Sequence, residues 1–227
     1  MRQFVIGDVH GCKATLVALL EKINAQWDDE IYFLGDYIDR GRDSKGVLDT
    51  IFTLIEVGYK VTCLTGNHEA MLLGGYKGNR DDARDWLDNG GKQALKSFNV
   101  QHLQDIPPQY IEFMDAMPYL VEVGDYILVH AGLNFKAKNP LTPNIQMAWI
   151  RDWYGAIDHK WLGNRYIIHG HTPQSLEDTR SQLLFLEMER VLNIDCGCVF
   201  NSRALNTLAC FELTTKQLYV QESIEFL

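Results

Sequence analysis

The sequence has no long apolar run and no cluster of basic residues, and each absence excludes a class of protein. No apolar stretch approaches the roughly 18 residues of a membrane helix, and MRQFVIGD leads straight into a predicted strand. We therefore expect neither a membrane span nor a signal peptide, and we predict a cytoplasmic protein. Lys and Arg total 21 against 30 Asp and Glu, and the net charge of -9 argues against binding nucleic acid or membrane through bulk charge.

Cysteine is also scarce. The five cysteines are odd in number and their spacing does not suggest a disulfide framework, so we predict reduced thiols. Cys196 and Cys198 are too close in sequence for easy disulfide geometry. With no second Cys pair or His pair near them to complete a zinc site, small core residues are the favoured interpretation.

Internal repeats, low-complexity segments and changes in composition are absent as well. With 227 residues, 46% of them hydrophobic, the chain is long enough to bury a substantial core. We expect a single domain over residues 1–227, and a monomer.

The first third of the chain alternates short apolar runs with amphipathic segments. We predict strands at 4–7 and 31–35, helices at 13–24 and 44–57, and a third strand from 60. Such alternation favours parallel strands with helices on the faces of the sheet. Binding sites in these sheets gather at the carboxyl ends of the strands.

The rest of the chain is more varied. Residues 69–117 are predicted helical, broken by GGYKGN at 74–79 and by the proline pair at 107–108, and Gly124-Asp125 predicts a hairpin turn. After an irregular segment at 132–165, mostly antiparallel strands are expected at 166–170, 183–187, 191–197, 205–213 and 217–222. The expected fold class is α/β, a four-layer α/β/β/α sandwich of two mixed sheets flanked by helices. The second sheet depends partly on the resemblance described below.

Five apolar runs end abruptly in residue types that bind metals: FVIGDVHG, YFLGDYIDRG, TCLTGNHE, YILVHAG and YIIHGHT. Alone, an Asp after a strand is as readily a turn or cap residue, and a single His a core residue. Together they supply a mixed oxygen and nitrogen set suited to Mn, Fe or Zn. The candidate ligands are Asp8, His10, Asp36, Asn67, His130 and His171.

Six ligands exceed what one metal needs, so two divalent ions are expected, with Asp36 as the natural bridge. Two such ions, less two carboxylates and a bridging hydroxide, leave a local charge of about +1. Arg40 would add a guanidinium fork able to grip two phosphate oxygens. An acidic protein can therefore bind an anionic, phosphorylated substrate.

The motifs GDVHG, GDYIDRG, GNHE and HGHT, in this order between Gly7 and Thr172, resemble the signature of the phosphoprotein phosphatase (PPP) family of metallophosphoesterases. Within that family, the chain is similar to the short bacterial and phage enzymes, such as the lambda phage phosphatase. The wider superfamily often has Gly-His-x-His, whereas Pro173 stands here in place of the second His. This difference favours the PPP branch over nuclease or cyclic-nucleotide branches.

The resemblance implies a role for each candidate. Asp8 and His10 would hold one metal, Asp36 would bridge, and Asn67, His130 and His171 would hold the other. His68 would be the general acid, supported by Asp39, and Arg40 would clamp phosphate. A second phosphate-binding arginine is expected before HGHT, with Arg151 preferred and Arg165 as the alternative, while His169 is expected to be structural or to lie behind the ligands. The expected cofactors are two divalent transition-metal ions, with manganese favoured over iron or zinc.

The predicted activity is hydrolysis of phosphomonoesters by a metal-bridging hydroxide, without a phosphoenzyme. The first choice of substrate is a phosphorylated protein, which makes the chain a serine/threonine phosphatase. The alternative is a phosphorylated small molecule, cleaved by a bis(5'-nucleosyl)-tetraphosphatase, because the same bacterial branch contains such enzymes with very similar motifs. A hypothesis of another class is a binding protein that keeps the fold without the chemistry, and the intact ligand set argues against it.

Overall fold

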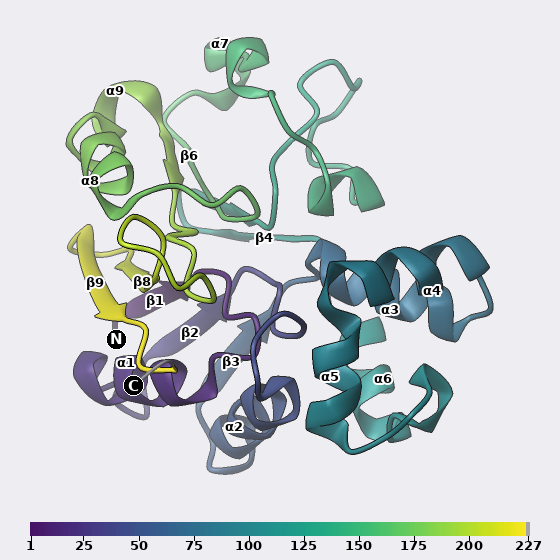
Figure 1. The fold of residues 1–227 in the computed structure, drawn as a ribbon. Helices are drawn as coiled ribbons and strands as arrows, with labels where there is room; N and C mark the ends of the chain where they lie inside the picture. The colour runs from purple at the N-terminus through teal and green to yellow at the C-terminus, as the bar shows by residue number, and fades with distance from the viewer. Residues whose placement is uncertain (226–227) are drawn as a thin grey trace.

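The computed structural model describes residues 1–225 and contains two mixed β-sheets, arranged as in Figure 1. The first sheet has the order β3-β2-β1-β8-β9 and the second has the order β4-β5-β6-β7. The strands of the first sheet are β1 (Gln3–Ile6), β2 (Glu30–Phe33), β3 (Lys60–Cys63), β8 (Thr207–Glu212) and β9 (Gln217–Glu222). Those of the second are β4 (Leu120–Val123), β5 (Tyr126–Val129), β6 (Tyr166–His169) and β7 (Val191–Asn193).

Strand β1 lies at the centre of the first sheet. It pairs in parallel with β2, where Phe4 is opposite Ile31, and antiparallel with β8, where Phe4 is opposite Glu212. Thus the strand nearest the start of the chain depends on a neighbour that follows some 200 residues later. The β-α-β-α-β opening predicted from the sequence is confirmed, with parallel pairing of β1, β2 and β3.

Both faces of the central strands are buried, because successive side chains of a strand point to opposite faces. In β1, Phe4 and Ile6 belong to the core beneath the helices, while Val5 belongs to the core between the two sheets. In β5, Leu128 faces the same inter-sheet core and Ile127 faces outward beneath the irregular segment 132–165. This double burial explains the unbroken apolar runs in the sequence.

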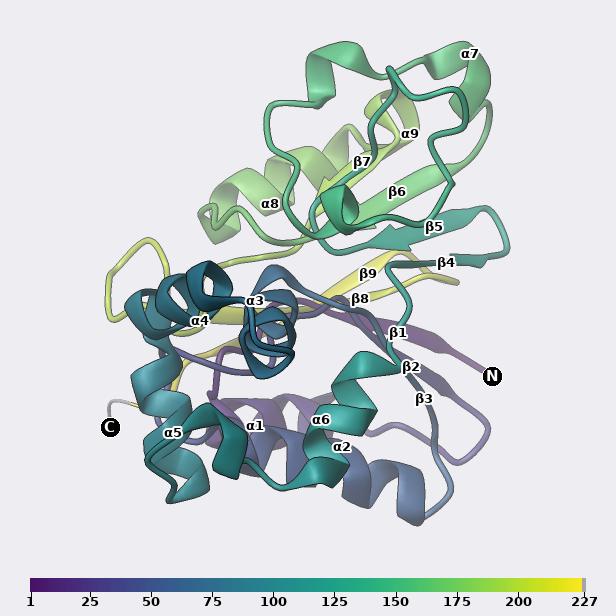
Figure 2. The ribbon, with the colours of Figure 1, turned by 90° about the vertical axis from the view of Figure 1, so that its right-hand side faces the viewer.

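Helices cover the outer faces and complete the sandwich (Figure 2). They are α1 (Lys13–Ile23), α2 (Ser44–Glu56), α3 (Asn67–Tyr76), α4 (Arg80–Trp86), α5 (Lys92–Phe98), α6 (Pro108–Asp115), α7 (His159–Leu162), α8 (Leu176–Leu184) and α9 (Leu186–Glu189). Figure 2 shows α1 and α2 below the first sheet, α7 and α9 at the top of the second, and α8 beside β7. The four-layer α/β/β/α arrangement predicted from the sequence is confirmed. Within residues 1–225, no helix combines the length and apolarity that crossing a membrane requires.

The predicted strand at 183–187 is wrong, because this segment ends α8 and begins α9. Leu184 and Phe185 remain exposed and only Leu186 is buried, so the apolar run does not mark a strand. The antiparallel prediction is also wrong for β6 and β7, which pair in parallel with β5 and with each other, although it holds for β8 and β9.

The predicted helix break at 74–79 starts too early, since α3 continues through Gly74 and Gly75 to Tyr76. A Cβ on Gly74 would lie 2.0 Å from the Asp82 carboxylate, and one on Gly75 would lie 2.8 Å from the Ala83 backbone. These glycines let α3 and α4 approach closely, and this packing offsets their low helix propensity.

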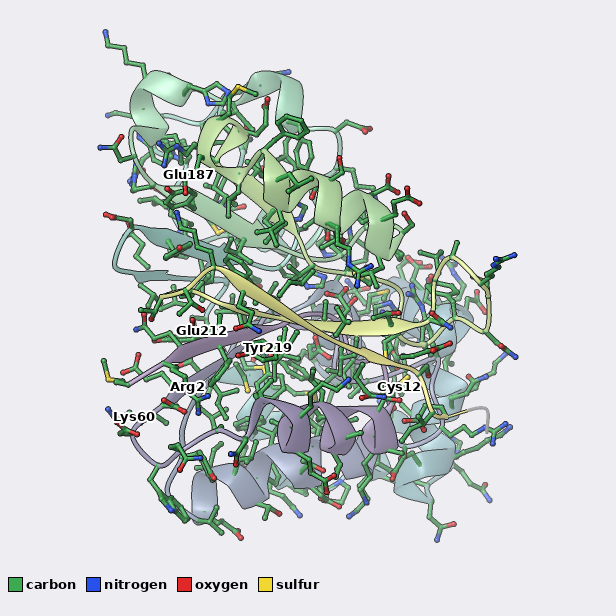
Figure 3. All side chains as sticks on the ribbon, turned by 90° about the vertical axis from the view of Figure 1, so that its left-hand side faces the viewer. Arg2, Cys12, Lys60, Glu187, Glu212 and Tyr219 are labelled. Carbon is green, nitrogen blue, oxygen red and sulfur yellow. The ribbon has the colours of Figure 1, made fainter. Side chains whose placement is uncertain are left out.

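Two contacts fix the ends of the described chain. Asp29 accepts hydrogen bonds from the backbone N and the guanidinium Nη2 of Arg2, both at 2.6 Å. Glu225 accepts hydrogen bonds from the backbone N of Thr15 at 2.9 Å and from its hydroxyl at 3.1 Å, in the first turn of α1. Figure 3 shows Arg2 at one end of the first sheet and Cys12 at the other. The Arg2–Asp29 pair therefore lies far from the loop that carries His10.

Candidate metal centre

The predicted ligands follow the ends of strands from both sheets. Asp8 follows β1, Asp36 follows β2, Asn67 begins α3 after β3, His130 follows β5 and His171 follows β6. All are buried. The amide oxygen of Asn67 lies 3.1 Å from His130 Nε2 and 2.8 Å from His171 Nδ1. Asp8 lies outside both groups described next and meets the cluster through its Oδ2, which accepts from the backbone N–H of His171 at 3.0 Å. Two groups lie within metal-binding distance of one another: His10, Asp36 and His68, and then Asp36, His130 and His171.

The backbone in these loops is held in an uncommon conformation. His10, Asp36, Asp39, Arg40 and His171 all have positive φ, between 46° and 71°. Non-glycine residues rarely adopt such angles, and clusters of them mark functional sites. The loops also touch: a Cβ on Gly35 (φ 120°) would lie 2.7 Å from the backbone of Gly66. Side chains are thereby directed into one small volume.

Asp36 occupies the middle of the cluster. Its Oδ2 lies 3.4 Å from Nε2 of His10, and its Oδ1 lies 3.5 Å from Nε2 of His130. Each carboxylate oxygen thus faces a different imidazole. This is the geometry expected of a carboxylate that bridges two metal ions.

Backbone carbonyls fix the tautomers of two imidazoles. His10 Nδ1 donates to the Ile38 carbonyl at 2.9 Å, and His130 Nδ1 donates to the Leu34 carbonyl at 3.1 Å. Neutral rings bonded in this way present the Nε2 lone pair to the cluster, as metal-binding histidines do. The lone pair of His130 then faces the amide oxygen of Asn67 at 3.1 Å. Two acceptors this close favour a cation between them.

Orphaned buried atoms provide an independent test of fit. Among the described residues, Asp8 Oδ1, His68 Nε2 and His171 Nε2 are buried without a hydrogen-bond partner. Buried polar atoms almost always have partners, so an unpaired carboxylate oxygen and an unpaired imidazole nitrogen at one site indicate donors suited to a cation. The residues present fit divalent metal ions.

Burial also perturbs the acids of the centre. It raises the pKa of Asp36 to about 7, against the lowering effect of the His68 backbone N–H and of Arg40. It raises the pKa of Asp195 to about 7, and burial followed by the charges of Asp195 and Asp36 raises the pKa of Asp8 well above its usual range. Buried carboxylates this close need cations to remain ionised together.

His68 and Asp39 form a second unit beside the ligands. His68 Nδ1 donates to Asp39 Oδ2 at 2.7 Å, and the indole N–H of Trp86 donates to Asp39 Oδ1 at 2.9 Å. Burial, the nearby His10 and the charge of Arg40 lower the pKa of His68. The hydrogen bond to Asp39 orients the ring, and the Asp39 carboxylate is placed to stabilise its charged form.

Two arginines lie beside different histidines of the cluster. Arg40 Nη1 donates to His10 Nε2 at 3.0 Å, and Arg151 Nη1 donates to the Thr172 hydroxyl at 2.9 Å, next to His171. Burial is the main cause of the lowered pKa of His10, about 3, and of His171, about 2, and the charges of Arg40 and Arg151 respectively contribute. Each arginine thus brings a positive charge to a different residue of the cluster.

Arg165 is not placed for that role. It donates to the carbonyls of Leu162 and Trp161, pairs with Glu122 at 3.6 Å and packs on the Trp161 ring. His169 is bound by Tyr154, whose hydroxyl lies 2.6 Å from Nε2, and lies outside both ligand groups found in the described chain.

Sequence reasoning missed three residues that shape the centre. Glu69 accepts hydrogen bonds from the backbone N of Asp36 and Tyr37, both at 2.9 Å, and so holds the loop after β2. Asp195 stands beside Asp8, and Trp86 bonds to Asp39. The Glu of GNHE offered a signal because it follows a predicted strand, and the Asp of NIDCGC offered one as an acidic residue inside the apolar strand predicted at 191–197. Trp86 offered none, because its contact depends on how α4 folds back.

The chain is similar to known enzymes in sequence. The Bacillus velezensis protein bis(5'-nucleosyl)-tetraphosphatase PrpE [asymmetrical] is 25% identical, covering 88% of this chain and 85% of the relative. A symmetrical bis(5'-nucleosyl)-tetraphosphatase from Marinomonas sp. is 38% identical, but over 38% of this chain and 37% of its own.

Solved structures share the fold. A putative diadenosine tetraphosphatase superposes with a TM-score of 0.68 at 18% identity, covering 98% of this chain and 93% of the other. A Saccharomyces cerevisiae serine/threonine phosphatase with similarity to human PP5 gives 0.67 at 14% identity, covering 100% and 81%. The model of the calcineurin-like phosphoesterase family matches residues 1–208. The protein therefore belongs to the calcineurin-like phosphoesterases, and its phosphatase relatives identify it as a hydrolase.

Proposed function

We propose that the protein hydrolyses dinucleoside tetraphosphates, as a bis(5'-nucleosyl)-tetraphosphatase. The observation that carries the proposal is a pair of arginines on the buried ligand cluster, Arg40 bonded to His10 and Arg151 bonded to Thr172 next to His171. A linear polyphosphate presents several charged groups in a row, which suits two separated guanidinium groups. The similarity to tetraphosphatases over 88% of the chain supports the same substrate class.

The ligand roles are part of this proposal. Asp8 and His10 would hold one divalent ion, Asp36 would bridge, and Asn67, His130 and His171 would hold the second. When bound, such ions neutralise phosphate charge and lower the pKa of water. Manganese is the proposed metal, because the mixed carboxylate, amide and imidazole donors suit it.

The residues around the ligands would carry the remaining steps. Arg40 and Arg151 would bind phosphate oxygens and orient the chain. His68 Nε2, which is buried and has no partner among residues 1–225, would carry the proton given to the leaving oxygen. Asp39 would stabilise the charged ring through its 2.7 Å hydrogen bond.

A serine/threonine protein phosphatase is the second candidate. The full-length fold similarity to the PP5-like enzyme supports it, together with the PPP-type motifs of this chain. The two candidates would share the metals and the acid and differ only in what surrounds them. A monomer, the cytoplasm and a single domain over 1–227 remain predictions.

The test compares kcat/KM for diadenosine tetraphosphate and for a panel of phosphoserine and phosphothreonine peptides on manganese-loaded protein. We expect at least about a tenfold preference for the dinucleotide. A preference for peptides would instead make the chain a protein phosphatase.

The control variant is Asp36→Asn, which keeps the volume but removes the bridging charge. Removing a group on which both metals depend should lower turnover of every substrate by about a thousandfold or more. If wild type and Asp36→Asn both fail to cleave an aryl phosphate with Mn(II), the chain is a binding protein.

A further inference from the structure

Two aromatic hollows open on the surface, each with one of the two site arginines in its wall. Arg151 lines a cavity of about 370 Å³ together with Phe135, Lys136, Gln146 and Trp149. Arg40 lines another of about 430 Å³ together with Asp88, Asn89, Gln93 and Phe200. The chemistry proposed above uses neither hollow.

The ring of Trp149 is the accessible aromatic surface of the first hollow. It is 41% exposed, although the neighbouring Trp153 is buried. Phe135 lines the same cavity, and Lys136 and Gln146 supply polar groups at its edge. A tryptophan that served only to pack the core would be buried, so an exposed indole in a concave site points to a ligand-binding role.

Phe200 is the accessible aromatic ring of the second hollow, the one that contains Arg40. It is 36% exposed and its ring centroid lies 5.9 Å from the Arg40 guanidinium carbon. It belongs to the segment between β7 and β8, whereas Asn89 and Gln93 come from the helices around 87–98. Two segments far apart in sequence thus build one hollow. Their amides and the Asp88 carboxylate can pair with base edges or ribose hydroxyls.

We propose that these hollows bind the two nucleoside ends of one substrate, one base against Trp149 and the other against Phe200, with the phosphate chain held between Arg151 and Arg40. The inference rests on the proposed function and extends it to residues that never touch the phosphates. Each hollow combines an open aromatic ring, side-chain amides and the arginine that ends the phosphate site. A phosphoserine side chain carries no planar group for either ring.

The ligand for the test is a methylene-bridged, non-hydrolysable analogue of diadenosine tetraphosphate, titrated by calorimetry into manganese-loaded protein. Stacking of a base on an aromatic ring contributes to affinity at each hollow, so Trp149→Ala and Phe200→Ala should each raise the Kd of the analogue by about tenfold. The double variant should raise it by about a hundredfold, because separated sites add. The Kd of inorganic tripolyphosphate, which has no base, should change less than about twofold.

Matched controls come from exposed rings elsewhere. Trp27 is 62% exposed and stacks on Tyr59, and Phe185 is 52% exposed on the second helical layer. Trp27→Ala and Phe185→Ala should bind the analogue as wild type does. Tyr154, 43% exposed in an adjoining cavity that also contains Arg151, is the competing ring. Loss of binding in Tyr154→Ala with normal binding in Trp149→Ala would overturn the Trp149 assignment.

Hydrolysis by wild type separates the two proposals. If wild type cleaves diadenosine tetraphosphate but the single variants bind the analogue normally, the hollows are not nucleoside sites and the function stands. If the variants lose binding but wild type does not cleave the dinucleotide, the hollows stand and the function fails. If wild type binds tripolyphosphate but not the analogue, both are overturned.

Discussion

Asp39 has both carboxylate oxygens engaged by side chains, one by His68 and one by Trp86. Trp86 is fully buried and packs directly on Gly91. A Cβ at position 91 would lie 2.5 Å from the indole, so only glycine leaves room for the ring. The indole N–H therefore reaches Asp39 from a fixed direction. We infer that Trp86 is a positioning residue for the proposed acid, acting through Asp39.

Substitution of Trp86 by Phe tests this inference, since Phe keeps most of the volume and removes the N–H. A hydrogen bond to a charged group contributes about 1.5–3 kcal/mol, so kcat for a substrate with a poor leaving group should fall by about ten- to a hundredfold. An aryl phosphate needs less help from a general acid, so its kcat should fall much less. An equal loss for both substrates would indicate only a packing role. Trp27→Phe is the matched control.

Arg151 and Arg165 provide a second comparison between residues of one type. Arg151→Ala should raise KM for the dinucleotide by about ten- to a hundredfold, because a guanidinium–phosphate contact is charge-assisted. Arg165→Ala should leave KM near the wild-type value, since its guanidinium is bound to Leu162, Trp161 and Glu122. Steady-state kinetics measures both. If the two variants had equal KM values, the proposal that Arg151 binds the phosphates would be wrong.

At the scale of elements, the segment α4 to α5 supports the centre from one side. Its middle, Leu87–Gly91, is a kink between two helices, at which Gly90 has the non-helical angles φ 118° and ψ 0°. A Cβ on Gly90 would lie 2.6 Å from the backbone N of Arg40. The kink therefore lies directly against the proposed phosphate clamp.

Gly90→Ala should therefore lower both stability and phosphate affinity. Gly78 is a matched control with φ 99°, because no described atom lies within 4 Å of a Cβ built there. Both alanine variants should lose about 1 kcal/mol of unfolding free energy from the positive φ. Gly90→Ala should lose at least about 1 kcal/mol more and bind tripolyphosphate less tightly. Denaturant unfolding measures the loss of stability, and calorimetry measures the affinity for tripolyphosphate. If Gly90→Ala and Gly78→Ala gave equal values of both, the Arg40 backbone would be able to shift away from the added methyl group without cost.

The sequence predicted those elements whose signals are local. The motifs after β1, β2, β3, β5 and β6 each stand at the end of an apolar run, so the ligand cluster was predictable without distances. The strand predicted at 183–187 was wrong because, in sequence, exposed apolar residues such as Leu184 and Phe185 at the end of a helix look the same as the apolar run of a buried strand. Gly74 and Gly75 misled because their helix packs on α4. The contacts of Trp86 with Asp39 and of Gly90 with Arg40 cross about 50 residues and depend on tertiary packing.

On the scale of the whole molecule, the proposed metals would join the two sheets. Asp8 and Asp36 extend from the first sheet, and His130 and His171 extend from the second. Mn(II) at about a hundred times its Kd should add about 2.7 kcal/mol to the unfolding free energy. For a chain of this size that raises Tm by about 5–10 °C. Calorimetric scans with Mn(II) and with a chelator measure the shift, which Asp36→Asn should largely abolish.

The free energy of unfolding should fall in acid partly because of Asp29. This residue lies at the end of the first sheet that is far from the metal centre. Burial raises the pKa of Asp29, but hydrogen bonds from Arg2 and Gln26 more than offset this, so the folded pKa lies below its ordinary value. Its stabilising contribution is complete above the unfolded pKa of about 3.9 and disappears as pH falls through the lower folded value.

Asp29→Asn should therefore cost about 2 kcal/mol at pH 7 and much less near pH 2. Urea unfolding in a chelator, at both pH values, measures the difference without a contribution from metal release. A cost that did not depend on pH would assign the effect to packing. Lys60→Gln, also at that end of the sheet (Figure 3), is the control.

The position of β1 has a consequence for how the protein is made. All six proposed ligands have left the ribosome once His171 is free, yet the antiparallel partner of β1 is β8, at residues 207–212. Until then the growing chain carries a complete set of ligands on a sheet with an unpaired apolar edge, which favours aggregation. We expect nascent chains that end before β8 to need a chaperone, and the metals to bind only after synthesis has passed that strand.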